Sequence, residues 1–275
     1  MKRIIVPIDF SPYSEHAFIS AVNIAELTDA SITCVNVVTA NVDWKNISVK
    51  DWVNFPEIID LEEEATDKLN AFVQEKAVST VPVEAVVEVG IPYDVIIDIA
   101  NRHKADLIVI GAYGKGYEEG RFIGSNLQKV IRLADCPVLA VRKVLDKAAM
   151  GKMAFASLFN QASKPAFNQM LPLIREVDAS VDFLYINLKD RPTDHAEVMA
   201  KMDTFNPLEE GLTLSKNIQD HEEAEQGIID YATSNRIGWI GIASNTRKAS
   251  SSYSIGVTET VIYRTDIPVL SVKVD

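Results

Sequence analysis

Short apolar runs recur along the first half of the chain. They are rich in β-branched residues and lack clean alternation, which is typical of strands buried on both faces of a parallel sheet. We therefore expect strands in five runs: Met1–Phe10, Ser31–Val38, Val83–Val89, Asp106–Gly111 and Pro137–Val141.

Segments with apolar residues at helical spacing separate these runs. One helix is expected after Ser11-Pro12, and others over Glu57–Lys76, Tyr93–His103 and Ser125–Leu133. Residues 41–56 contain three aromatic side chains and are expected to form a packed loop or short helix. Strands that alternate with helices predict an α/β fold, with a doubly wound parallel sheet and helices on both faces.

The second half of the chain repeats the first. Residues 97–132 align with 229–264 without a gap at an offset of 132, so that Ile97, Ile108 and Gly124 meet identical residues. After one deletion, the PVLAV segment that ends at Val141 meets PVLSV. The sequence therefore predicts two tandem domains of about 140 residues, which we assign to residues 1–143 and 151–275.

PVLAV and PVLSV are expected to be edge strands, one in each repeat. Because sheet edges need covering or pairing, we expect the two repeats to dock through these strands as an intramolecular pseudo-dimer. Association of two chains into a homodimer stays open.

The segment Gly111–Asn126 (GAYGKGYEEGRFIGSN) places glycines between a strand and a helix. Gly111 and Gly114 follow the fourth apolar run, and Gly124-Ser125 opens the next helix. Glycine lets a backbone approach a ligand closely, and a helix start offers unpaired N–H groups and a positive dipole end. The pattern predicts a phosphate-binding site. The alternative is that the glycines only form turns and Ser125 only caps the helix.

Asp9 lies at the carboxyl end of the first expected strand and is expected at the same edge of the sheet as this segment. Ligands of open α/β sheets bind at the carboxyl ends of the strands. A carboxylate at this edge can accept a hydrogen bond from a ribose hydroxyl or hold a phosphate-bound cation.

The pattern Gly111-x2-Gly114-x9-Gly124-Ser125 matches the ATP-binding signature of the universal stress protein family at every defined position. The first 143 residues resemble that family throughout, with further similar segments at residues 4–11, 35–38, 90–92, 105–111 and 136–141. The resemblance implies two flavodoxin-like domains, each with a five-stranded parallel sheet.

The resemblance also implies that ATP, with or without Mg²⁺, is the ligand, and it assigns a contact to each of seven residues. These are Asp9 at the ribose or a phosphate-bound cation, Val37 at the adenine, Gly111 and Gly114 at the ribose and phosphates, and Gly124, Ser125 and Asn126 at the phosphates. Lys115 and Arg121 in the same loop either add positive charge or are exposed loop cations.

The second repeat departs from the signature. Ala243, Thr246 and Val257 stand where the first repeat has Gly111, Gly114 and Ser125, and Leu158 aligns with Asp9. We expect ATP in the first repeat alone. Whether the second repeat binds another anion, near Asn245, Arg247 and Ser250–Ser252, stays open.

Composition limits the other functions. The net charge of −12 argues against a nucleic-acid or membrane partner, which needs a positive surface. No run approaches the length of a membrane span.

The two cysteines are far apart, so a disulfide framework is not expected and the cytoplasm is the expected location. No Walker motif or ligand-spaced histidine pair occurs, and no metal site is expected from histidines.

Three functions are compatible with these observations. The first is an ATP-binding regulatory protein of the stress response in which the nucleotide orders residues 113–123 as a switch. The second is a slow ATPase or self-phosphorylating enzyme, for which Asp9 is the sole candidate base. The third is an interaction module with a vestigial nucleotide site. We favour the first, with no catalytic residue.

Overall fold

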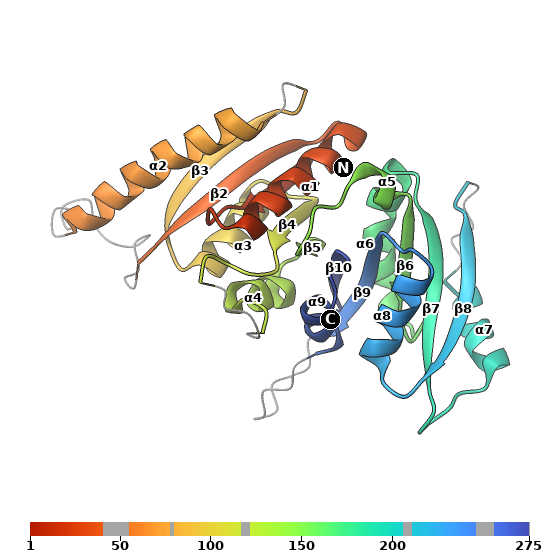
Figure 1. Ribbon diagram of the computed structural model, residues 1–275. Helices are drawn as coiled ribbons and strands as arrows, with labels where there is room; N and C mark the ends of the chain where they lie inside the picture. Colours follow the sequence, from red (N-terminus) through yellow and green to blue (C-terminus); the bar gives the residue numbers. More distant parts are fainter. Residues whose placement is uncertain (41–54, 78–79, 117–121, 206–210, 246–255, 275) are drawn as a thin grey trace.

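The computed structural model describes residues 1–40, 55–77, 80–116, 122–205, 211–245 and 256–274 (Figure 1). The predicted loop at residues 41–56 therefore lies almost wholly outside the described residues. The N-terminal half contains these elements: β1 (Arg3–Pro7), α1 (Pro12–Thr28), β2 (Ser31–Thr39), α2 (Pro56–Lys76), β3 (Val83–Gly90), α3 (Pro92–Arg102), β4 (Leu107–Gly111), α4 (Ser125–Leu133) and β5 (Val138–Val141).

A short helix, α5 (Lys147–Met150), leads into the C-terminal half. That half contains β6 (Lys152–Ala156), α6 (Ser163–Glu176), β7 (Ser180–Leu188), α7 (His195–Asp203), β8 (Leu214–His221), α8 (Ala224–Ser234), β9 (Trp239–Asn245), α9 (Val257–Arg264) and β10 (Val269–Val274). The two halves have the same order of strands and principal helices, and α8 begins 132 positions after α3, the offset found in the sequence.

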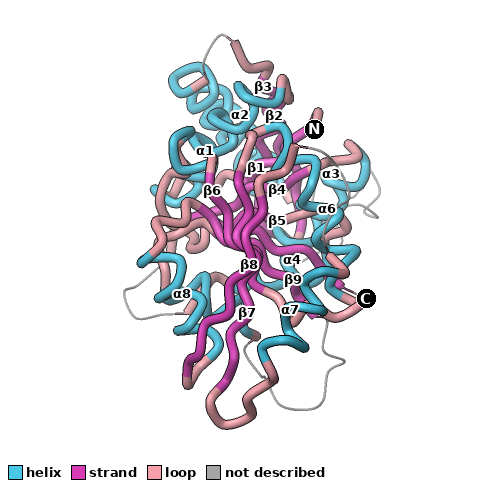
Figure 2. The backbone as a smooth tube through the Cα atoms, turned by 90° about the vertical axis from the view of Figure 1, so that its right-hand side faces the viewer, coloured by secondary structure: helices cyan, strands magenta, loops and turns pink. Residues whose placement is uncertain are grey.

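All the strands join one ten-stranded sheet of order β3-β2-β1-β4-β5-β10-β9-β6-β7-β8. Each half contributes five parallel strands, and helices cover both faces of the sheet (Figure 2). The fold is therefore two tandem flavodoxin-like domains, as predicted.

The two halves meet at β5 and β10, the strands for which docking was predicted. They pair antiparallel, with Ala140 opposite Val269 and Val138 opposite Ser271. Beside this seam, the Arg132 guanidinium donates to the buried Glu259 carboxylate at 2.7 Å. Backbone and side chains thus both cross from one half to the other.

The first strand is shorter than the predicted Met1–Phe10. It ends at Pro7 because the chain turns there: Phe10 has a left-handed φ of 61°, and Ser11 caps α1 by accepting from Ser14 N. The turn moves Asp9 out of the strand and into the loop beyond its carboxyl end.

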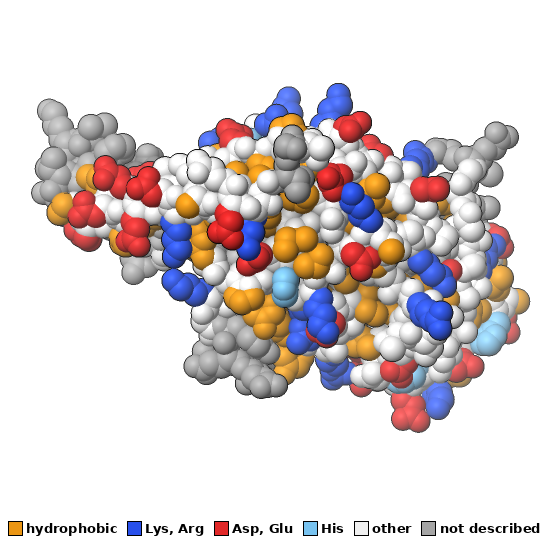
Figure 3. Space-filling view, turned by 45° about the horizontal axis from the view of Figure 1, so that its top comes forward, with side chains coloured by type: hydrophobic (Ala, Val, Ile, Leu, Met, Phe, Trp, Pro, Cys, Tyr) orange, Lys and Arg blue, Asp and Glu red, His pale blue; other side chains and the backbone are white. Residues whose placement is uncertain are grey.

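Acidic side chains gather over α2, which lies along one end of the molecule (Figure 3). This agrees with the acidic outer face that is expected for a helix over Glu57–Lys76. Within the described residues, no helix combines the length and apolar character that crossing a membrane requires.

Both cysteines are free, and burial raises the pKa of each thiol to about 12. At pH 8 we therefore expect Cys34 and Cys136 to react with Ellman's reagent far more slowly in the native protein than in urea, because only the thiolate attacks. The same shifts predict that stability falls above about pH 9, since the unfolded thiols lose protons first. Complete reaction of both native thiols within seconds would contradict this.

Candidate functional site

A cavity of about 540 Å³ lies at the carboxyl ends of β1, β2 and β4, beside the start of α4. Its volume is within the range of small-molecule sites, about 300–1,000 Å³. The position is the one that parallel α/β sheets use for ligands, because the loops after the strands leave a crevice there.

All seven residues that the sequence assigned to a ligand line this cavity. They are Asp9 after β1, Val37 in β2, Gly111 and Gly114 at and after the end of β4, and Gly124, Ser125 and Asn126 at the start of α4. The fold therefore brings together residues that are more than 100 positions apart in the chain.

Asp9 holds the first turn of the glycine-rich loop. Its Oδ2 accepts from the backbone N–H of Lys115 at 2.7 Å, while its Oδ1 accepts from the N–H and hydroxyl of Ser11. A carboxylate has about four acceptor positions, so capacity for a ligand remains after these three bonds.

The glycines serve different purposes. A Cβ at Gly111 would lie 2.8 Å from the backbone of Tyr13, so this glycine lets α1 pack against the end of β4. A Cβ at Gly114 would lie 2.9 Å from Asp9 Oδ2. At Gly124, by contrast, a Cβ would meet no heavy atom within 4 Å among the described residues. The first two glycines thus allow close internal packing, and Gly124 leaves space for a ligand.

The amino end of α4 faces this space. Gly124 is the N-cap residue and has no side-chain cap, and the N–H groups of Ser125, Asn126 and Leu127 have no acceptor inside the helix by geometry. Uncapped N–H groups and the helix dipole together favour an anion, and above all a phosphate.

Sequence reasoning missed two aromatic residues, Tyr113 and Phe122, that line the cavity. Both lie inside the recognised motif, but the glycine spacing says nothing about them. Tyr113 packs edge-on against Tyr13 with ring centres 5.1 Å apart. Phe122 lies 5.0 Å from the ring of Tyr263 in the other half. The cavity wall therefore touches both halves of the protein.

Of the two loop cations, Lys115 contributes its backbone N–H, and its side chain is absent from the described lining. Arg121 lies outside the described residues. Asp9 is the one charged side chain among the described lining residues. The site thus offers one carboxylate and a helix terminus, a set that suits a nucleotide whose phosphates carry a cation.

The matching place in the C-terminal half is built differently. Leu158, at the position of Asp9, is 62% exposed. A Cβ at Gly256 would collide with the Glu259 carboxylate, which lies at the start of α9. The predicted anion site at Asn245, Arg247 and Ser250–Ser252 falls in a stretch whose side chains are outside the described set.

The model of the universal stress protein family matches residues 1–142. The chain belongs to this family. A universal stress protein of Methanocaldococcus jannaschii is 34% identical over 143 residues, which cover 52% of this chain and 82% of that relative. The match covers the half that contains the cavity.

Solved structures extend the likeness in fold to the whole chain. A universal stress protein from Archaeoglobus fulgidus superposes with a TM-score of 0.75 at 14% identity, covering 98% of both chains. A functionally unknown protein from Pseudomonas aeruginosa superposes with a TM-score of 0.63 at 16% identity, covering all of this chain and 93% of that one. At such identities, the likeness concerns the fold alone.

Proposed function

We propose that this universal stress protein binds ATP in the N-terminal cavity and acts as a nucleotide-dependent regulatory protein of the stress response in the cytoplasm. One observation carries the proposal: the Asp9 carboxylate and the uncapped start of α4 border the same cavity, with open space at Gly124. This arrangement supports a ligand with hydroxyl groups at one end and phosphates at the other.

The lining supports a division of the cavity among the parts of the nucleotide. Val37, Ile96 and Ile110 supply an apolar wall for the adenine. Asp9 would accept from the ribose or hold a phosphate-bound Mg²⁺, which keeps most of its own waters. Ser125 and Asn126 would donate backbone N–H groups to the phosphates.

We further propose that the domain of residues 1–143 binds one ATP and that the domain of residues 151–275 binds none. The Glu259 carboxylate supports this, because it lies where a phosphate would approach α9 and would repel it. The pairing with Arg132 holds that carboxylate in place. The second domain then acts as a structural and regulatory partner, and the seam at β5 and β10 keeps the two domains paired in solution.

The two aromatic residues of the cavity wall, Tyr113 and Phe122, would couple nucleotide binding to contacts at the seam between the halves. The Arg142 guanidinium lies over the Tyr113 ring, 5.2 Å from its centre, and Phe122 packs on Tyr263. A nucleotide that orders the loop between Tyr113 and Phe122 would therefore change contacts at the seam, where a partner protein could sense them.

Calorimetry tests the proposal. The wild type is expected to bind about one ATP per chain, and Asp9→Ala to weaken binding about tenfold, the loss of one charge-assisted contact. Asp190→Ala removes an equal charge from an exposed loop and should bind as the wild type does. No binding by the wild type, two ATP per chain, or unchanged affinity in Asp9→Ala would each count against the proposal.

The same samples decide between regulation and catalysis. Phosphate release by the wild type that disappears in Asp9→Ala, at ATP concentrations that still saturate the variant, would favour the slow ATPase. ATP retained through purification and seen by mass spectrometry would argue against a vestigial site.

A further inference from the structure

A second cavity, of about 480 Å³, lies on the seam between the halves. One wall is Arg142, which follows β5. The others come from the ends of α8 and α9 and from the turns before β9 and β10, and they include Thr233, Arg236, Arg264 and Thr265. Because β10 runs antiparallel to β5, these distant segments meet at one end of the seam.

The charges around this cavity are unlike those of the whole chain, whose net charge is −12. Three arginines and one carboxylate, Asp266, are found among its described lining residues. Asp266 is already shared between Arg142 at 3.4 Å and Lys143 at 2.6 Å. Positive charge is therefore in excess in the cavity.

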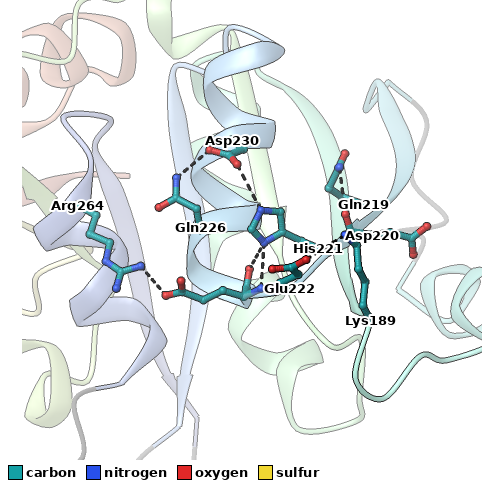
Figure 4. A network of polar contacts seen from close by, with 9 residues as sticks. Lys189, Gln219, Asp220, His221, Glu222, Gln226, Asp230 and Arg264 are labelled. Carbon is teal, nitrogen blue, oxygen red and sulfur yellow. Dashed lines mark hydrogen bonds and ion pairs between the residues drawn. The ribbon is translucent and has the colours of Figure 1, made fainter.

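Each arginine keeps donors for a ligand. Arg264 reaches from α9 to Glu223 at the start of α8 with one nitrogen, Nη1 (Figure 4). Arg142 donates through Nη1 to the carbonyl oxygens of Tyr263 and Thr265, and its buried Nε makes no hydrogen bond among the described residues but lies 3.4 Å from Asp266 Oδ1. Arg236 is exposed and forms no ion pair within the described part of the chain.

We propose that this cavity binds a small anion with a phosphoryl or carboxylate group, held by Arg236 and Arg264 beside Arg142. The planar guanidinium fork matches both groups and binds either of them through two parallel hydrogen bonds. A structural ion-pair network alone would pair Arg236 as well, and no carboxylate among the described residues does so.

The site is separate from the nucleotide cavity but touches its wall. The Arg142 guanidinium lies over the Tyr113 ring, and Tyr113 lines the nucleotide cavity. An anion that binds the Arg142 guanidinium would therefore change the same contacts at the seam as the nucleotide. The binding itself does not depend on whether the nucleotide cavity takes ATP.

Site-resolved NMR of the full chain tests the proposal, with inorganic phosphate and succinate as the two probes. The backbone amides of Thr233, Thr265 and Ile267 report on this cavity, and those of Gly114 and Ser125 report on the nucleotide cavity. We expect saturable shifts in the first set. A response to phosphate alone would assign a phosphoryl ligand, and a response to succinate alone would assign a carboxylate.

The variant Arg236→Gln removes the unpaired cation and is expected to weaken anion binding at these amides about tenfold. Arg191→Gln makes the same change in an exposed loop of the C-terminal half and should bind as the wild type does. Shifts confined to Gly114 and Ser125, or an Arg236→Gln variant with unchanged affinity, would overturn the proposal.

Discussion

Replacing Gly124 by valine is expected to weaken ATP binding at least about 100-fold without lowering the melting temperature. The backbone at Gly124 has φ −58° and ψ 140°, which any residue adopts, and a Cβ there meets no heavy atom of the described residues within 4 Å. The valine side chain would fill the region in front of the α4 amides and exclude the phosphates. Losing charge-assisted hydrogen bonds worth about 1.5–3 kcal/mol each accounts for the size of the effect.

Titration calorimetry and thermal denaturation of the same sample measure both parts of this prediction. Gly151→Ala is the control, because Gly151 also tolerates a Cβ, with its nearest neighbour at 3.9 Å, and lies on the linker side of β6. The control should keep full affinity. If Gly124→Val binds ATP like the wild type, the start of α4 is not the phosphate site.

Replacing Gly238 by alanine is expected to destabilise the protein by about 3 kcal/mol, at the upper end of overpacking costs. A Cβ at Gly238 would overlap the carbonyl oxygen of Ala149 and lie 2.5 Å from its carbonyl carbon. The obstacle is backbone, and it is pinned from both sides: Gly238 N donates to Lys152 O, and Trp239 Nε1 donates to Met150 O.

For a chain of this length, such a cost lowers the melting temperature by roughly 6–12 °C. Urea denaturation followed by circular dichroism gives the free energy of unfolding directly. The matched control is again Gly151→Ala, which adds the same methyl group beside the same short helix, α5. A stability loss below about 1 kcal/mol in Gly238→Ala would mean that α5 moves aside freely.

The fold could be predicted because its signals are local. Strands buried on both faces appear as apolar runs, and the gapless offset of 132 found in the sequence is also the offset between α3 and α8. The end of β1 at Pro7 was missed, because the left-handed turn at Phe10 depends on backbone geometry that the residue pattern of this segment does not show.

Only those residues of the candidate site that belong to the glycine motif, or to segments resembling the family, could be predicted from the sequence. Glycine spacing does not reveal that Gly111, besides lining the cavity, makes room for Tyr13. Nor does it reveal Glu259, which aligns with the apolar Leu127 and meets Arg132 only across the seam. The arginine cavity was missed for the same reason, since pairing of β5 with β10 assembles it from segments more than 80 positions apart.

The joined sheet also bears on how copies of the chain can associate. Because β5 and β10 pair with each other, β3 and β8 are the strands at the two ends of the sheet. Glu84 and Glu88 lie in β3, and Lys216 and Asp220 lie in β8. Charged side chains on such strands oppose strand-by-strand growth, so we expect the two ends of the joined sheet to resist edge-to-edge association of copies of this chain.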